Sequence, residues 1–213
     1  MASNYGVNDI GKWRFAEIDL PQEWLEHLGE LPELFRMYIS GDPGEGKTEY
    51  IMKLSMMLAN HYGKVHLNNV EQGKHKGILQ SWERNNFKDE VPAGKWMYGN
   101  KLIKWDDYLK KMGNRNSGKV LIIDSISYWE LTYAQVKELH ELFPRKSLVF
   151  VAYGADYAKH RAIRHLCDIK VVVKDFEAKV RSRFGGMKPL IVWEKGFKDS
   201  KNKKPTGQIP LGL

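Results

Sequence analysis

The sequence predicts a three-layer α/β domain with a mainly parallel central sheet and antiparallel strands at its C-terminal edge. Three observations lead to this fold class. Short apolar runs alternate with helical patterns, as they do in strand–helix–strand units. A glycine-rich loop, residues 41–48, lies between a strand pattern and a helix pattern. Beyond residue 168, three strand-like segments follow one another with little helix between them.

The composition fits one domain of this kind. The chain has 213 residues, of which 42% are hydrophobic, so it can bury one sizeable core. Its only cysteine, Cys167, rules out an intramolecular disulfide, and we expect a cytoplasmic location without signal peptide or membrane span. The formal net charge of +8 is compatible with a nucleic-acid partner, and equally with an ordinary basic surface.

The first elements lead into the glycine-rich loop. Residues 1–33 form a lead-in segment, in which Leu20–Gly29 has the pattern of a short helix with Pro21 near its start. We expect this helix to pack on the edge of the core. The main domain, residues 34–196, then opens with a strand over Leu34–Ser40, the glycine-rich loop and a helix from Thr48 to about Tyr62, closed by Gly63.

The middle of the chain continues the alternation of strands and helices. Lys119–Asp124 is an apolar run that is too short for a typical helix and is bounded by polar residues, so we predict a buried parallel strand. The other elements expected here are a strand over Lys64–Val70, a helix over Lys76–Asn85, a short strand over Lys95–Tyr98, an amphipathic segment over Trp105–Met112, a helix over Tyr133–Phe143 and a buried strand over Ser147–Tyr153.

The C-terminal part has a different pattern. Antiparallel edge strands are expected over Ile169–Val173, Lys179–Arg183 and Pro189–Trp193, because no helical stretch of useful length separates them. Residues 197–213 are basic, charged and rich in turn-forming residues. We interpret them as a solvated tail, with a basic arm as the alternative.

The glycine-rich loop carries the most specific motif. Its sequence, Gly41-Asp42-Pro43-Gly44-Glu45-Gly46-Lys47-Thr48, matches the phosphate-binding pattern G-x-x-x-x-G-K-[ST] between a strand and a helix. Glycines let the backbone aim several N–H groups at phosphate oxygens, and the following helix adds its positive end. We expect these eight residues and Glu49 to bind ATP, with Lys47 on the outer phosphates and Thr48 on Mg²⁺.

Two carboxylates follow neighbouring strands. Asp124, at the tip of a buried strand, is the candidate magnesium ligand, and capping of the next turn is the alternative. Ser125 follows it, so the base that polarises the attacking water has to come from another position. Glu71 is the candidate, because the carboxyl ends of parallel strands gather beside the phosphate-binding loop, and a solvated glutamate is the alternative.

These motifs together resemble the ATPase core of the RecA superfamily, particularly its RadA, DnaB-helicase and KaiC branches. The resemblance implies a RecA-like P-loop NTPase fold and a catalytic base at Glu71. It covers residues 34–195, although the chain has neither the zinc-binding module of RadA nor a helicase N-terminal domain. The segments that carry it are Gly41–Thr48, Asn68–Glu71, Leu121–Ile126 and Arg164–Val173.

A further segment, Val180–Gly185, resembles the basic motif with which RadA and DnaB reach into the neighbouring subunit's nucleotide site. The resemblance implies that Arg183 is an arginine finger and Arg181 its companion, although Arg181 stands where lysine is usual. A cation supplied in this way stabilises charge on the transferring phosphoryl group. Two exposed arginines on a strand are the alternative.

The resemblance also implies DNA-facing loops after the strands that end at Asp124 and Tyr153. The first loop is short. In the second, Tyr157 lies close in sequence to three cationic or titratable side chains, which suits stacking on a single strand and neutralisation of its phosphates. An ordinary surface loop is the alternative. The candidate nucleic-acid residues are therefore Tyr157, Lys159, His160 and Arg161.

The sequence therefore predicts a Mg²⁺-dependent ATPase that assembles as a homo-oligomer, in a ring or filament. We expect it to act on single-stranded DNA in recombination, repair or replication, and an unidentified protein partner stays open. Two other functions stay open as well. One is a nucleotide-switched scaffold without turnover. The other is a small-molecule or nucleoside kinase, for which we find no arginine-rich lid in the sequence.

Overall fold

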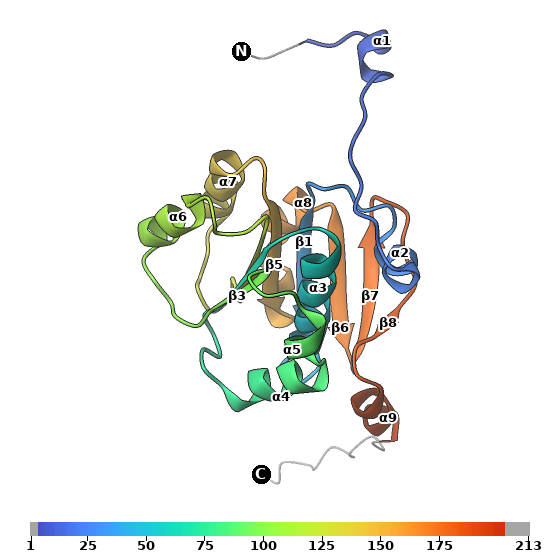
Figure 1. The fold of residues 1–213 in the computed structure, drawn as a ribbon, viewed down its shortest axis with the longest axis vertical. Coiled ribbons are helices and arrows are strands. Elements are labelled where there is room, and N and C mark those ends of the chain that lie inside the picture. The colour runs from blue at the N-terminus through green and yellow to red at the C-terminus, as the bar shows by residue number, and fades with distance from the viewer. Residues whose placement is uncertain (1–3, 203–213) are drawn as a thin grey trace, which may run out of the picture.

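The computed structural model describes residues 4–202, and within them the strands form one eight-stranded sheet (Figure 1). The order across the sheet is β3-β2-β4-β5-β1-β6-β7-β8. The strands are β1 (Arg36–Gly41), β2 (Val65–Asn69), β3 (Trp96–Gly99), β4 (Val120–Asp124), β5 (Ser147–Tyr153), β6 (Ile169–Lys174), β7 (Glu177–Ser182) and β8 (Leu190–Ile191).

Pairing within the sheet is parallel from β3 to β6 and antiparallel from β6 to β8. The predicted fold class is therefore confirmed. The central strand β1 lies between β5 and β6, and β5 separates it from β4. Because all the parallel strands point the same way, the loops after β1, β2 and β4 lie at the same edge of the sheet.

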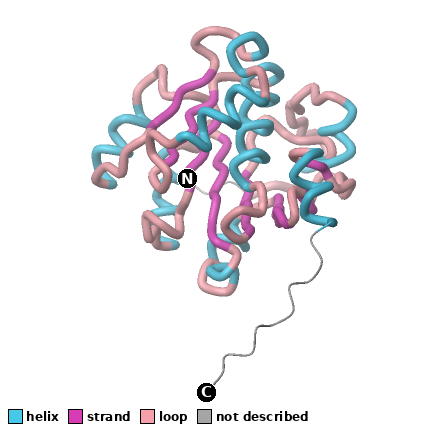
Figure 2. The backbone as a smooth tube through the Cα atoms, turned by 90° about the horizontal axis from the view of Figure 1, so that it is seen from below, coloured by secondary structure: helices cyan, strands magenta, loops and turns pink. Residues whose placement is uncertain are grey.

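Helices cover both faces of this sheet, as Figure 2 shows from below. One face packs against α2, α3 and α5, and the other packs against α6, α7 and α8. The helices are α1 (Val7–Ile10), α2 (Gln22–Leu28), α3 (Lys47–His61), α4 (Lys76–Arg84), α5 (Phe87–Glu90), α6 (Trp105–Gly113), α7 (Tyr133–Leu142), α8 (Arg161–Leu166) and α9 (Glu194–Asn202), with a 3₁₀ turn over Ala155–Tyr157.

The central strands divide their side chains between two cores. Ile122 points into the core beneath α3, whereas the adjacent Leu121 and Ile123 belong to the core beneath α6 and α7. Successive side chains of a strand point to opposite faces, so a strand covered on both faces favours apolar residues on both of them. This explains why the sequence shows continuous apolar runs here. Within residues 4–202, no helix is both long and apolar enough to cross a membrane.

The lead-in helix α2 packs against β7, as the sequence predicts. Gly29 ends it with φ +82°, and a Cβ at this position would lie 2.0 Å from the Phe184 carbonyl oxygen. His27 is buried, and its ring nitrogens contact the Lys188 carbonyl at 2.6 Å and the Tyr50 hydroxyl at 3.0 Å. The chain that precedes this helix extends away from the sheet and carries α1 (Figure 1).

One expectation needs correction at the C-terminal end. The sequence predicts a turn-rich solvated segment from residue 197, but α9 extends over Glu194–Asn202. Gly196 is buried, and a Cβ there would lie 2.4 Å from the Trp193 ring and 2.8 Å from the Phe176 ring. Two aromatic side chains therefore hold a short charged helix that its own composition does not favour. Residues 203–213 of the expected tail lie outside the described residues.

Candidate nucleotide-binding site

The phosphate-binding loop leaves the carboxyl end of β1 and enters α3 directly. Gly44 and Gly46 have φ +83° and φ +100°, values that favour glycine. A Cβ on Gly41 would lie 2.3 Å from the Val173 carbonyl oxygen, and a Cβ on Gly46 would lie 2.7 Å from the Phe176 ring. The backbone conformation therefore favours glycine at position 44, the close approach of β6 requires it at position 41, and both reasons apply at position 46.

The turn between β6 and β7 fixes this loop from the side. The Phe176 N–H donates to the Glu45 carbonyl at 3.0 Å, and the Asp175 N–H donates to the Glu45 carboxylate. On the other side, the Gly154 N–H donates to the Gly41 carbonyl at 3.0 Å. The end of β5 and the turn between β6 and β7 thus hold the loop in place, and Glu45 accepts both hydrogen bonds from the turn.

A pocket of about 470 Å³ opens beside the loop, a size that suits a small-molecule ligand. It collects predicted residues from three strand ends. Its lining consists of Pro43, Gly44, Gly46, Lys47, Thr48, Glu49, Glu71, Gln72, His75, Gly77, Gln80, Arg84, Asp124, Phe176 and Trp193. Gly41, Asp42 and Glu45 instead line a second hollow, on the other side of the loop, with Gly154 and Lys174.

The Lys47 ammonium lies within the loop itself. Its Nζ donates to the carbonyls of Gly41 at 2.6 Å and Asp42 at 3.0 Å. Partial burial lowers the pKa of Lys47, while the negative charges of Asp124 and Glu71 oppose that shift. The loop therefore places a cation opposite two carboxylates across the pocket.

Asp124 and Glu71 end the neighbouring strands β4 and β2. The Asp124 carboxylate is buried and accepts a hydrogen bond from Asn69 Nδ2 at 3.0 Å. Burial and then the negative charge of Glu71 raise the pKa of Asp124 to about 7, with Lys47 acting in the opposite direction. The Val70 N–H donates to the Asp124 carbonyl at 2.7 Å, so the backbones of the two strand ends are joined directly.

Glu49 forms part of the pocket wall together with a cation that the sequence analysis missed. Arg84 Nη2 lies 2.6 Å from Glu49 Oε1, and Asn85 Nδ2 donates to Glu49 Oε2 at 3.1 Å. The Arg84 guanidinium also lies 4.3 Å from the centre of the Trp193 ring. Arg84 thereby ties α4 to the first turn of α3 and to the segment before α9.

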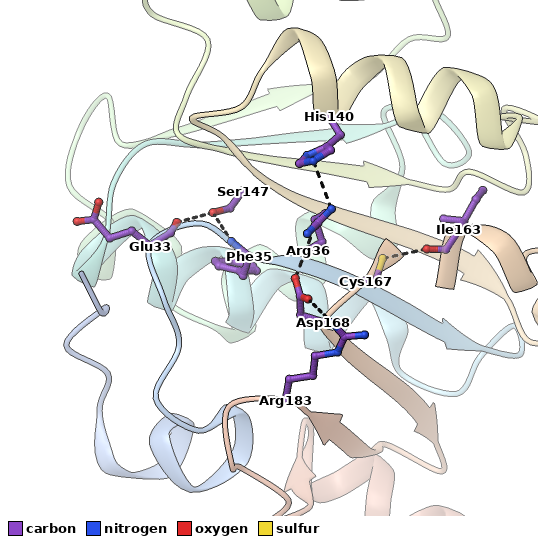
Figure 3. Close-up of polar contacts among 9 residues, drawn as sticks. All are labelled: Glu33, Phe35, Arg36, His140, Ser147, Ile163, Cys167, Asp168 and Arg183. Atoms are coloured by element: carbon purple, nitrogen blue, oxygen red, sulfur yellow. Dashed lines mark hydrogen bonds and ion pairs between the residues drawn. The ribbon is translucent and has the colours of Figure 1, made fainter. Parts of the chain in front are cut away.

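Arg181 and Arg183 lie at the opposite end of the sheet from the loop, because β7 runs antiparallel to β6. Arg183 Nη1 lies 3.3 Å from Asp168 Oδ1, and Asp168 Oδ2 lies 3.6 Å from Arg36 Nε (Figure 3). Arg183 is thus level with the first residue of β1, whereas the loop follows its last residue, roughly 16 Å further along at 3.3 Å per residue. Neither arginine reaches the pocket of its own chain.

The candidate nucleic-acid residues extend from the last residue of the 3₁₀ turn, Tyr157, to the first residue of α8, Arg161. Tyr157 packs against the Arg164 guanidinium, which lies 3.4 Å from the ring centre. His160 is buried, and its Nδ1 contacts the Tyr38 hydroxyl at 3.2 Å. The expectation that His160 contributes to a nucleic-acid surface is therefore wrong, because its ring is inside the core. Tyr157, Lys159 and Arg161 remain exposed.

No family model and no curated protein sequence matches the chain. Solved structures resemble it closely enough to compare folds. A KaiC-like protein from the hyperthermophilic archaeon Pyrococcus horikoshii superposes with a TM-score of 0.60 at 16% identity, over 83% of this chain and 93% of that one. The flagellar accessory protein FlaH from Methanocaldococcus jannaschii superposes with a TM-score of 0.56 at 18% identity, over 84% of this chain and 97% of that one.

The chain has the RecA-like P-loop fold. In this RecA-like fold, the positions of Lys47, Asp124 and Glu71 follow from strand order, which is why sequence reasoning could bring them together. Strand order does not indicate that Arg84, Trp193 and Asn69 belong to the site. Their places depend on how α4 and the C-terminal segment pack against the loop, and no local pattern in the sequence shows this.

Proposed function

We propose that this chain binds ATP and hydrolyses it with Mg²⁺, in the cytoplasm. The observation that carries the proposal is the convergence of Lys47, Glu71 and Asp124 from separate strand ends on one pocket of about 470 Å³. The loop supplies backbone N–H groups and the start of α3 for the phosphates, and Lys47 supplies a cation for the outer ones. Arg84 and Trp193 line the same pocket, and the nucleoside would lie on their side of it.

The magnesium ion would be held by the Thr48 hydroxyl and the Asp124 carboxylate. The chain fits such an ion, because a buried carboxylate with a pKa of about 7 needs a nearby cation to stay ionised, and Lys47 offers only part of that charge. When bound, the ion would neutralise charge between the β- and γ-phosphates. Glu71, which is less buried than Asp124, would accept the proton of the attacking water.

Glu71→Gln tests the proposal. The variant keeps the size of the side chain but loses a strong proton acceptor, so we expect it to bind ATP normally and to turn over at least about tenfold more slowly. Fluorescent-nucleotide titration and steady-state phosphate release measure the two properties. Lys47→Ala is the contrasting variant and should lose binding. A normal rate in Glu71→Gln would reassign the base, and binding without turnover in the wild-type chain would favour the scaffold.

Assembly into a ring or filament is part of the proposal. Arg183 and Arg181 cannot serve their own pocket, so they would act on the pocket of a neighbouring copy stacked head to tail. Two further surfaces support this arrangement. Near α1, apolar side chains are exposed on the extended N-terminal arm, namely Tyr5, Val7, Ile10, Trp13 and Phe15. At the other end, α4 and β3 form an apolar groove of about 490 Å³ with Leu79, Trp82, Trp96 and Tyr98.

Action on single-stranded DNA, in recombination, repair or replication, is the finer part of the proposal. The net charge of +8 and the exposed Tyr157, Lys159 and Arg161 support it. ATP turnover measured with and without single-stranded DNA, at several salt concentrations, tests it. A rate that is insensitive to DNA would remove this part and leave the ATPase intact. Phosphate transfer to a nucleoside acceptor would instead favour a kinase.

A further inference from the structure

Ser125 follows Asp124 directly and is fully buried, with 0% of its surface exposed. Its Oγ donates a hydrogen bond to Glu71 Oε2 at 3.0 Å. The same Oγ accepts a hydrogen bond from the Tyr128 N–H at 3.1 Å. A hydroxyl has one proton to donate, so the amide that occupies its lone pair leaves the proton directed at the carboxylate. Ser125 is therefore the donor in this hydrogen bond, and Glu71 is the acceptor.

The turn that carries Ser125 is itself rigid. The Trp129 N–H donates to the Ser125 carbonyl at 3.1 Å, and the Leu131 N–H donates to the Ile126 carbonyl at 3.1 Å. The Tyr153 N–H at the end of β5 donates to Ser127 Oγ at 3.0 Å. Ser125 is thus fixed by its own turn and by the neighbouring strand, and not by Glu71 alone.

The Glu71 side chain is less confined than that of Ser125, although the Tyr153 hydroxyl also lies close to its carboxylate. It is only partly buried, and three side-chain torsions separate its carboxylate from the backbone. Its backbone N–H lies 3.4 Å from the Asp124 carbonyl, which fixes the main chain but not the carboxylate. A base that must meet one water molecule loses efficiency when it samples several rotamers, because the reactive geometry is then rarely populated.

We propose that Ser125 is a positioning residue for Glu71: it binds one carboxylate oxygen and so leaves the other facing the pocket. This inference rests on the proposed ATPase function. It also gives Ser125 a role that differs from simple filling of space, because a side chain without a hydroxyl could pack there but could not orient Glu71. The hydroxyl lies one residue from Asp124, so the same strand end would hold the metal ligand and orient the base.

The test compares Ser125→Ala with Ser147→Ala. Ser147 is also fully buried, and its Oγ donates to the Glu33 carbonyl at 2.6 Å and accepts from the Phe35 N–H at 3.4 Å, at the far end of the sheet (Figure 3). Both variants lose one buried hydroxyl that makes two hydrogen bonds, so thermal unfolding should show similar losses of stability. Only Ser125→Ala should lose kcat, by about tenfold or more, with KM for ATP unchanged.

Two further variants separate positioning from general damage. Ser125→Thr keeps the hydroxyl and should recover most of the kcat that Ser125→Ala loses. In a Glu71→Gln background, Ser125→Ala should cause no further loss, because the residue that it positions is already inactive. Turnover by the wild-type chain and its loss in Glu71→Gln test the proposed function separately. Given that turnover, an unchanged kcat in Ser125→Ala, or an equal loss in Ser147→Ala, would overturn the positioning role alone.

Discussion

Asp124 combines deep burial with a charge that the proposed reaction requires. Its pKa is raised to about 7 by burial and by the neighbouring Glu71, from an ordinary value of 3.8. The folded chain therefore holds this proton more tightly than the unfolded chain does. Stability contributed by the protonated carboxyl is complete below about pH 4 and is lost as the pH rises to about 7.

Asp124→Asn should therefore stabilise the chain at pH 8 and change little at pH 4. At about 1.4 kcal/mol per pH unit, the relief amounts to several kcal/mol, or about 5 °C or more in Tm. Thermal unfolding at the two pH values, without nucleotide, measures the difference. The same variant should lose the stabilisation that Mg²⁺ with nucleotide gives the wild type. Equal Tm values for Asp124→Asn and the wild type at pH 8 would show that ionised Asp124 does not destabilise the chain.

At the residue scale, sequence reasoning was strongest where a motif has a fixed place in a fold. Lys47 and Thr48 follow from the loop pattern, and Asp124 and Glu71 follow from their positions at strand ends. Arg84 could not be found in this way, because its partner Glu49 is 35 residues away in sequence. The burial of His160 could not be predicted, because its neighbours in sequence are exposed and its buried partner Tyr38 lies on the distant strand β1.

At the scale of the elements, the phosphate-binding loop depends on its glycines. The surroundings of two of them differ. Gly44 has φ +83° with open space around it, whereas Gly46 has φ +100° and the Phe176 ring 2.7 Å from where a Cβ would be. Alanine at either position is strained by its backbone conformation, at a cost of about 1–2 kcal/mol. At Gly46 it also meets Phe176.

Gly46→Ala should therefore destabilise the chain by about 1–3 kcal/mol more than Gly44→Ala, because the Phe176 ring has to move. Urea unfolding of the two variants measures this difference. Phe176→Ala combined with Gly46→Ala provides the control, since removal of the ring should make the two glycine positions cost the same. Equal losses in the single variants would mean that the ring moves away without cost.

Several elements can be predicted because their hydrophobic pattern is recognisable from their own residues, without knowledge of the rest of the fold. The strands β4 and β5 are apolar at nearly every position, and α3 runs from the loop almost to Gly63. The helices α5, α8 and α9 are not predicted from the sequence, because contacts with distant parts of the chain hold them in place. For α9, the decisive partners are the Phe176 and Trp193 rings, which no local pattern indicates.

At the scale of the whole molecule, the pocket and Arg183 lie at opposite ends of one sheet. Arg183→Ala and Glu71→Gln should each turn over at least about tenfold more slowly than the wild type. Their mixture should recover about a quarter of the wild-type rate, since one neighbouring pair in four combines an intact pocket with an intact arginine. Mixing Lys47→Ala with Glu71→Gln is the control and should recover nothing, because both defects lie in the same pocket. Steady-state phosphate release measures the rate of each mixture. No recovery in the mixture of Arg183→Ala and Glu71→Gln would argue against a site shared between two copies.

The antiparallel course of β7, which carries Arg183 away from its own loop, gives any open stack of copies a direction. One terminal copy has a nucleotide with no arginine above it, and the other has an arginine with nothing to act on. A stack of n copies would therefore contain n − 1 complete sites, whereas a closed ring would contain n. Turnover per copy would keep rising with protein concentration as open stacks lengthen, whereas it would be independent of concentration once closed rings have formed.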